Sequence, residues 1–520
     1  MENPYTKRKK EWYTKGLQKT GAAFLYGEEG YMTVFGCLLF LAVMSLLFLC
    51  LDGCLLYQAE TRCSMAQTGL SEHLLANYSQ PLAQRYHLYF LDPKMGEQEM
   101  QKRSLLYYKE LFADGEKNHV RPRLLRLEAE YVEAIPYGTM EERECQHLIA
   151  QIKDCMKYDL TKDLIFAKLQ SAAQETEQQS GQIDETIEDL SKNQSAAEED
   201  LDAADKTLES SQINIEESAD KIADQASPIQ KIRSVLKDGI LGVVVDESTL
   251  SERKLAPSLL PFPDQKENKI HISMELFENL DQIKQLLSQE SLGEWTENVT
   301  DKGALSLYMR KYFNYYGREK TLEDTGLLYE TEYLLGGQDS DKENLEYVIN
   351  RLILLRFALN STYGFSNEEL REEAFAAAAL LAGVTGSPEL IEVVRYLILS
   401  AVNLIESISD VQDLMAGKKV HLIKTAGTWK TSISGQTREH TGKEGLPYED
   451  YLLLLLVTKT NTEQMCLRMQ NLIQVNLQNE EPEFQIRQCH AGVQLSSKIR
   501  YQGRFSLGEY LLEEKEKFQY

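Results

Sequence analysis

The strongest feature of the hydrophobic pattern is one uninterrupted apolar run near the start of the chain. Tyr31 to Leu51 comprises 21 residues without a formal charge, which as an α-helix would measure about 31 Å, the thickness of a bilayer's hydrocarbon core. An amphipathic helical pattern then continues towards Pro81, with Leu70, Leu74 and Leu75 on one apolar stripe. The sequence therefore predicts a transmembrane helix over 31–51 that continues into a protein-packed helix.

A second pattern places hydrophobic or small residues at alternating spacings of three and four, from Ile183 to Ile222, although serine and glutamine interrupt this heptad seam. Between Ser171 and Gln225 there are 16 acidic residues against three lysines, and neither proline nor an aromatic residue. We expect a protruding acidic coiled-coil arm over 166–227. It would be either a simple solvated helix or an arm for self-association or partner docking.

Helical periodicity dominates the rest of the chain. The run Tyr451–Val457 is short and flanked by charges, so it is expected inside a core helix and not in a membrane. The helices are predicted at 305–316, 321–335, 341–359, 367–382, 388–414 and 447–477.

Strand patterns are few. Alternation predicts a strand at Leu125–Ala134, "ILGVVV" at 240–245 is either a strand or a buried turn, and the segment 484–505 alternates as a hairpin turning at Ala491 and Gly492. The predicted fold class is mainly α (α+β), with an N-terminal transmembrane helix, a helical ectodomain and a C-terminal β-hairpin or small sheet.

Charge indicates the orientation of the span. Six basic residues precede it, and only Arg62 follows within a dozen positions, so the positive-inside rule predicts a cytoplasmic N-terminus and an extracytoplasmic bulk. The expected organisation is a basic cytoplasmic tail at 1–30, the span at 31–51, a first ectodomain lobe at 52–165, the acidic arm at 166–227, and a mostly helical ectodomain with C-terminal strands at 228–520.

Two other interpretations of the apolar run are weaker. A cleaved secretory signal has a shorter apolar region that ends at small residues, and neither feature is present. The sequence "LDGC" at Leu51–Cys54 is similar to a lipoprotein signal, but Asp52 is a poor residue there and the apolar run is too long. We therefore expect a single-pass protein of the cell membrane.

The net charge and the cysteine spacing limit the kinds of ligand and cross-link that we expect. The formal net charge of −25 disfavours nucleic-acid binding, because phosphate contacts need a basic face. None of the eight cysteines forms a C-x-x-C pair, which argues against a zinc ribbon. If the chain is exported, Cys145 with Cys155 and Cys466 with Cys489 are candidate disulfides.

No catalytic constellation is visible. The eight histidines are not spaced as helical metal pairs, and no nucleophile elbow, phosphate-binding loop or dinucleotide fingerprint occurs. Lys424, Trp429 and Lys430 form either an anion-binding loop or a loop fixed by one tryptophan. Tyrosines at 107, 108, 312, 315 and 316 suit core packing better than carbohydrate stacking. We expect no enzyme activity, metal or cofactor.

Several segments together are similar to a known family. They include "GYMTVFGCLLFLAVMSLLF", "LLANYSQPLAQRYHLYFLD", "YETEYLLGGQDSDKENLEYVINRLILLRFALN", "LMAGKKVHLIKTAGTWKTSI" and "LPYEDYLLLLLV". They resemble an uncharacterised family of Firmicutes, mostly clostridial, membrane-anchored proteins that accompany tight-adherence (Tad) pilus components and begin like TadE or TadG.

The resemblance implies a pilin-like beginning, because a helix that is lipid-facing first and amphipathic afterwards is typical of pilins. It also implies a prepilin-type processing site between Gly30 and Tyr31, and other pilin-like or Tad assembly proteins as partners. Pilin precursors carry a glutamate at the fifth position after that site, where this chain has Phe35. The resulting hypothesis is a non-enzymatic minor pilin-like or accessory component of a Tad-type pilus or secretion apparatus. The alternative is an anchored receptor or sensor ectodomain.

Overall fold

The computed structural model describes residues 4–113, 126–160, 227–268, 272, 299–318, 325–382, 388–439, 442–458, 461–502 and 508–520. The chain forms two compact units. Unit 1 comprises 1–78, 90–138 and 490–520, and unit 2 comprises 79–89 and 139–489. This division corrects the predicted boundaries, because the C-terminal strands belong with the N-terminal helix and not with the helical lobe. The predicted acidic arm at 166–227 lies almost entirely outside the described residues.

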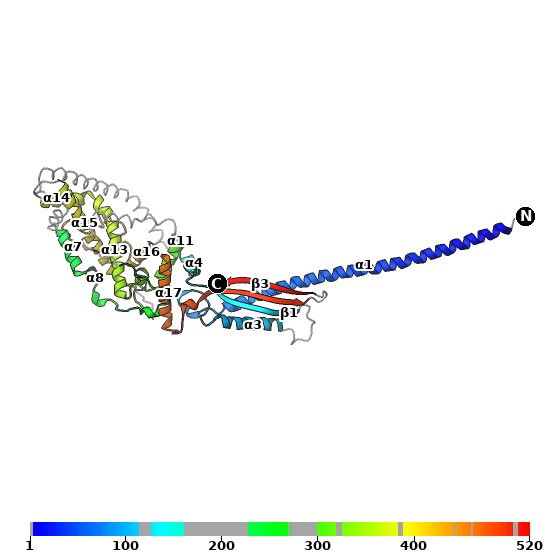
Figure 1. The fold of residues 1–520 in the computed structure, drawn as a ribbon. Coiled ribbons are helices and arrows are strands. Elements are labelled where there is room, and N and C mark those ends of the chain that lie inside the picture. Colours follow the sequence, from blue (N-terminus) through cyan, green and yellow to red (C-terminus); the bar gives the residue numbers. More distant parts are fainter. Residues whose placement is uncertain are drawn as a thin grey trace, which may run out of the picture. The chain divides into compact units, whose positions relative to one another are not determined.

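Unit 1 is organised around one long helix, α1 (Pro4–Leu75), drawn in blue in Figure 1. The charge-free run forms part of this helix without a break. It is the one helix among the described residues that is long and apolar enough to cross a membrane. The helix ends at Leu75, and Pro81 then lies in the first turn of α2 (Gln80–Tyr86), where its missing N–H costs no hydrogen bond.

A small sheet completes unit 1. Its strands are β1 (Arg126–Thr139), β2 (His490–Gln502) and β3 (Glu509–Gln519), in the order β1-β2-β3. Strands β2 and β3 are antiparallel, with Gly492 opposite Gln519 and Gln502 opposite Glu509. The small C-terminal sheet is thus confirmed, whereas the turn predicted at Ala491 and Gly492 is wrong, because both residues lie inside β2.

Gly492 has a different role from the one that the sequence suggested. A Cβ atom at this position would overlap the carbonyl oxygen of Phe518 on β3. A glycine inside a strand commonly marks such a close approach of two backbones. The residue therefore permits strand pairing rather than chain reversal.

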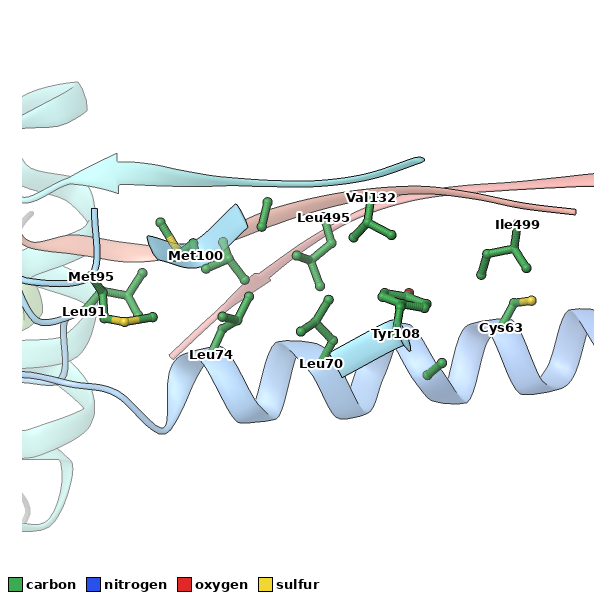
Figure 2. Packing of buried hydrophobic residues seen from close by; sticks show 13 residues of the cluster. Cys63, Leu70, Leu74, Leu91, Met95, Met100, Tyr108, Val132, Leu495 and Ile499 are labelled. Carbon is green, nitrogen blue, oxygen red and sulfur yellow. The ribbon is translucent and has the colours of Figure 1, made fainter. Parts of the chain in front are cut away.

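The core of unit 1 lies between α1, the sheet and α3 (Glu97–Ala113). Figure 2 shows Cys63, Leu70 and Leu74 projecting from α1 towards Leu495 and Ile499 of β2. Leu70 and Leu74 are fully buried, which confirms the predicted stripe. Burying a leucine side chain contributes roughly 1.5–3 kcal/mol, so this seam holds the C-terminal half of α1 on the sheet.

Unit 2 is almost entirely helical. Besides α2, it contains α4 (Glu142–Leu160), α7 (Ser227–Asp238), α8 (Ile240–Val244), α11 (Val299–Tyr312), α12 (Glu330–Gly336), α13 (Asp341–Ser366), α14 (Glu368–Ala382), α15 (Pro388–Met415), α16 (Tyr448–Thr458) and α17 (Thr462–Gln478). Among the described residues, short 3₁₀ turns lie at Glu247–Thr249, Pro257–Leu259 and Ile486–Gln488.

Three helices, α13, α14 and α15, pack against one another and form much of the unit 2 core. Tyr451–Val457 lies in α16 with most side chains buried, as the sequence predicted. The predicted helix 447–477 is instead two helices, α16 and α17. The segment "ILGVVV" contains helix α8, so the strand interpretation is wrong.

Candidate functional site

Residues 32–51 of α1 present an exposed apolar surface of the length and composition that a membrane span requires. The outward-facing large hydrophobic side chains of residues 32–51 expose between 40% and 75% of their surface. A helix of a water-soluble domain would bury such a face, because transfer of each leucine side chain out of water contributes roughly 1.5–3 kcal/mol of stability. Gly30 and Tyr31, where the family resemblance implies a processing site, lie within the continuous backbone of α1.

The change from an exposed apolar surface to a protein-packed surface occurs within one helical turn. Leu51 is 40% exposed, whereas Leu55 is 8% exposed and Ala59 is fully buried against Tyr501 of β2. Burial, and then the negative charge of Asp52, raise the pKa of the Tyr501 phenol, which places the two side chains near each other. The end of the β2–β3 hairpin is therefore held against α1 at the position where the apolar surface stops.

Unit 2 contains a buried charge network that the sequence did not reveal. Arg356 of α13 donates hydrogen bonds from Nε (3.1 Å) and Nη2 (2.7 Å) to Oδ2 of Asp410 on α15. Lys424 lies 2.7 Å from Oδ1 of the same carboxylate and 2.6 Å from Oε1 of Glu406. Burial alone would raise the pKa of Asp410, but the surrounding cations outweigh it and hold this pKa far below its ordinary value.

This network holds the segment between α15 and α16 against helices α13 and α15. Arg356 also donates to the carbonyl oxygens of His421 (3.0 Å) and Leu422 (2.8 Å), and Lys430 lies 2.9 Å from both Asp410 and Asp413. The ammonium groups of Lys424 and Lys430 are thus already matched by carboxylates. The geometry supports the interpretation of this loop as structural and weakens that of an anion site.

A second cluster of buried polar side chains surrounds α12. Glu332 accepts hydrogen bonds from the Tyr316 backbone N–H (2.9 Å) and the Tyr448 hydroxyl (2.8 Å). Desolvation raises the pKa of Glu330 and of Glu332 to about 7 each, and in both cases it outweighs the hydrogen bonds that lower the pKa. The guanidinium of Arg468 donates to the last carbonyls of the helix, so α12 is held by side chains from other helices.

The sequence does not predict either of these buried clusters, the one around Asp410 or the one around α12, because the residues that interact in them are distant in the chain. The available signal was a charge inside an otherwise apolar helical run, as for Arg356 in "LILLRFALN" and Asp410 in "LIESISDVQ". A charge in such a position is buried and must find a partner. The identity of that partner is not encoded locally.

The predicted disulfide pairs are not brought together. Cys145 contacts Cys466 instead, while the Cys155 thiol lies 3.8 Å from the Tyr312 hydroxyl and Cys489 lies 3.9 Å from the Gln485 carbonyl oxygen. All four cysteines are free thiols in this structure. The separations along the sequence suggested local pairs, but folding places α4 beside α17.

The tyrosine clusters serve as packing elements. Tyr108 is buried in unit 1, and Tyr312 packs on Tyr308 in unit 2 with ring centroids 4.6 Å apart. Tyr316 meets both Tyr329 and Tyr448 edge to face. Within the described ranges, no group of three or more His, Cys, Asp or Glu side chains is placed to hold a metal ion.

Residues 218–501 match the sequence model of a protein family, described as a family of unknown function (DUF5702). The match spans more than half of the chain. The chain belongs to this family. Comparison with curated proteins and with solved structures returned no match. The DUF5702 match includes the charge network, α12 and β2, whereas α1 precedes it.

Proposed function

We propose that the protein is a non-enzymatic, membrane-anchored, extracytoplasmic component of a Tad-type pilus or secretion apparatus, with a minor pilin-like or accessory role. The observation that carries the proposal is the two-part character of α1. Residues 32–51 of this helix are apolar and exposed, whereas the later part, up to Leu74, has one face buried against the sheet of unit 1. An anchored helix that also forms the spine of a folded domain is the general design of pilins.

The charge distribution supports the orientation. Lys7, Arg8, Lys9, Lys10, Lys15 and Lys19 all precede the span. Basic residues remain preferentially on the cytoplasmic side, which leaves both folded units outside. The net charge of −25 would also keep an extracytoplasmic domain soluble.

The anchor of the mature protein is proposed to remain uncleaved. Phe35 occupies the place of the carboxylate that pilin precursors use for assembly, and a carboxylate in lipid is costly enough to be retained only for a function. N-terminal sequencing of the protein from native membranes tests this point. A chain that begins at Tyr31 would indicate a fibre subunit, and a lipidated Cys54 would indicate a lipoprotein.

The partnership can be tested by photo-crosslinking in native membranes. A photoreactive residue at Leu39, which is 54% exposed, should capture a protein that has an apolar N-terminal helix of its own and belongs to the pilus apparatus. The control position is Leu55, which is 8% exposed and should react only within unit 1. Adducts with lipid alone at Leu39 would instead favour the anchored receptor.

A further inference from the structure

Cys145 and Cys466 come from distant parts of the sequence and meet inside unit 2. Both side chains are fully buried, and the neighbouring Cys145 thiol is the largest cause that raises the pKa of Cys466. The Gln470 amide, one turn after Cys466 on α17, donates a hydrogen bond of 3.4 Å to Sγ of Cys145. This hydrogen bond places the Cys145 thiol beside the face of α17 that carries Cys466 and Gln470.

The backbone at Cys145 is unusual as well. Arg143, Glu144 and Cys145 have φ angles of 51°, 57° and 63°, in the left-handed region that non-glycine residues rarely occupy. Each such residue costs on the order of 1–2 kcal/mol and persists only where the surroundings enforce it. A covalent link from Cys145 to α17 would enforce this conformation.

We propose that Cys145 and Cys466 are the disulfide-forming pair of the exported protein, and that the bond joins α4 to α17. The location part of this inference rests on the proposed extracytoplasmic function. The pairing part rests only on the contacts within unit 2.

The chemistry requires an oxidant, which is a small-molecule or protein disulfide in an oxidising compartment. The thiolate of one cysteine attacks the oxidant's disulfide, which forms a mixed disulfide and releases one thiol. The second cysteine thiolate then attacks the protein's sulfur in that mixed bond and releases the second thiol. Two protein thiols lose two electrons and two protons in all, and the oxidant becomes two thiols.

The reaction must precede closure of the core. Both thiols are buried, and contact with Cys145 together with desolvation raises the pKa of Cys466 well above its ordinary value. The reactive thiolate is therefore available during folding and not in the finished fold. After closure, the same burial would shield the bond from reductants.

The test is peptide mass spectrometry of the full chain from native membranes, with thiols alkylated in denaturant at lysis. The expected result is a linked peptide containing Cys145 and Cys466, with Cys155 and Cys489 alkylated. The link should disappear in a Cys466→Ser variant and persist in the control variant Cys489→Ser. A link between Cys145 and Cys155, or alkylation of all four, would overturn the proposal.

A second experiment separates the pairing from the location. The full chain, purified in detergent, is unfolded and refolded in a mixture of oxidised and reduced glutathione. If the bond forms there but is absent from native membranes, the inference fails because the extracytoplasmic location fails. If it forms in neither sample, the pairing is wrong and the proposed function is unaffected.

Discussion

Arg356 and Asp410 form a fully buried ion pair between α13 and α15, with Nη2 of the arginine 2.7 Å from Oδ2 of the aspartate and neither side chain exposed. The two residues are 54 positions apart in the sequence. The pair is completed by Lys424 and Lys430, so the negative charge of one carboxylate is surrounded by three cations. Removal of the Asp410 carboxylate should therefore leave the Arg356 guanidinium buried without a carboxylate partner.

The first prediction concerns this pair. The change Asp410→Asn should destabilise unit 2 by about 3–5 kcal/mol, because it leaves the buried Arg356 guanidinium without its carboxylate, although Lys424 keeps Glu406 and Lys430 keeps Asp413. The control change Glu247→Gln breaks an exposed ion pair with Lys342 and should cost less than about 1 kcal/mol. Chemical denaturation followed by tryptophan fluorescence measures both, since Trp429 lies beside the network. Equal effects of the two changes would refute this account.

The second prediction concerns the pH dependence of unit 2. The pKa of Glu332 is about 7 in the fold against an ordinary value of 4.5, so between these pH values the folded state binds more protons than the unfolded state. The stabilising contribution of this group is complete below about pH 4.5 and is lost as pH rises through about 7.

The free energy of unfolding should therefore fall less between pH 5 and 8 in the variant Glu332→Gln. The difference from the original protein in this total decrease should reach up to about 3 kcal/mol. Glutamine suits this test because the Tyr316 and Tyr448 donors both contact one oxygen, which the amide retains. Unfolding measured at several pH values gives the slopes. A variant with the slope of the original protein would show that Glu332 titrates normally.

The third prediction concerns the packed half of α1. Leu70→Ala should destabilise unit 1 by about 2–5 kcal/mol, because it removes a fully buried side chain from the seam between α1 and the sheet. Met65→Ala, on the same helix but 68% exposed, is the matched control and should change little. Hydrogen exchange of the β2 amides measures the effect in each variant. Unchanged protection in Leu70→Ala would mean that α1 does not support the sheet.

The fourth prediction concerns Gly492. A methyl group here would overlap the Phe518 carbonyl oxygen, so Gly492→Ala should separate β2 from β3 near the end of the chain. Gly96→Ala is the control, because no atom lies within 4 Å of its added Cβ. Hydrogen exchange of the β3 amides should rise in Gly492→Ala alone. Full protection of β3 in that variant would contradict the close pairing of the two strands.

Local patterns predicted the local features of this fold. The charge-free length of the span, the Leu70 and Leu74 stripe and the buried run Tyr451–Val457 all follow from periodicity within a single helix. Contacts between residues far apart in the sequence could not be predicted from periodicity. The pairing of β2 with β1, and the contact of Cys145 with Cys466, depend on the folded path of several hundred residues.

The errors have the same origin. The alternating pattern around Gly492 predicts a turn there, but the backbone neighbour of Gly492 is Phe518, whose position only the sheet determines. Similarly, the sequence offers Cys155 as a nearby partner for Cys145. The left-handed backbone at Cys145 directs that side chain towards α17, and no sequence motif signals this conformation.

We propose above that α1 crosses the membrane and that the chain after Leu51 lies outside. Protease is added to intact, cell-wall-stripped protoplasts that carry the protein with epitopes at its two ends. The account predicts that the C-terminal epitope is lost while an N-terminal fragment, containing the basic tail and the span, stays protected. Survival of the C-terminal epitope until the membrane is lysed with detergent would contradict it.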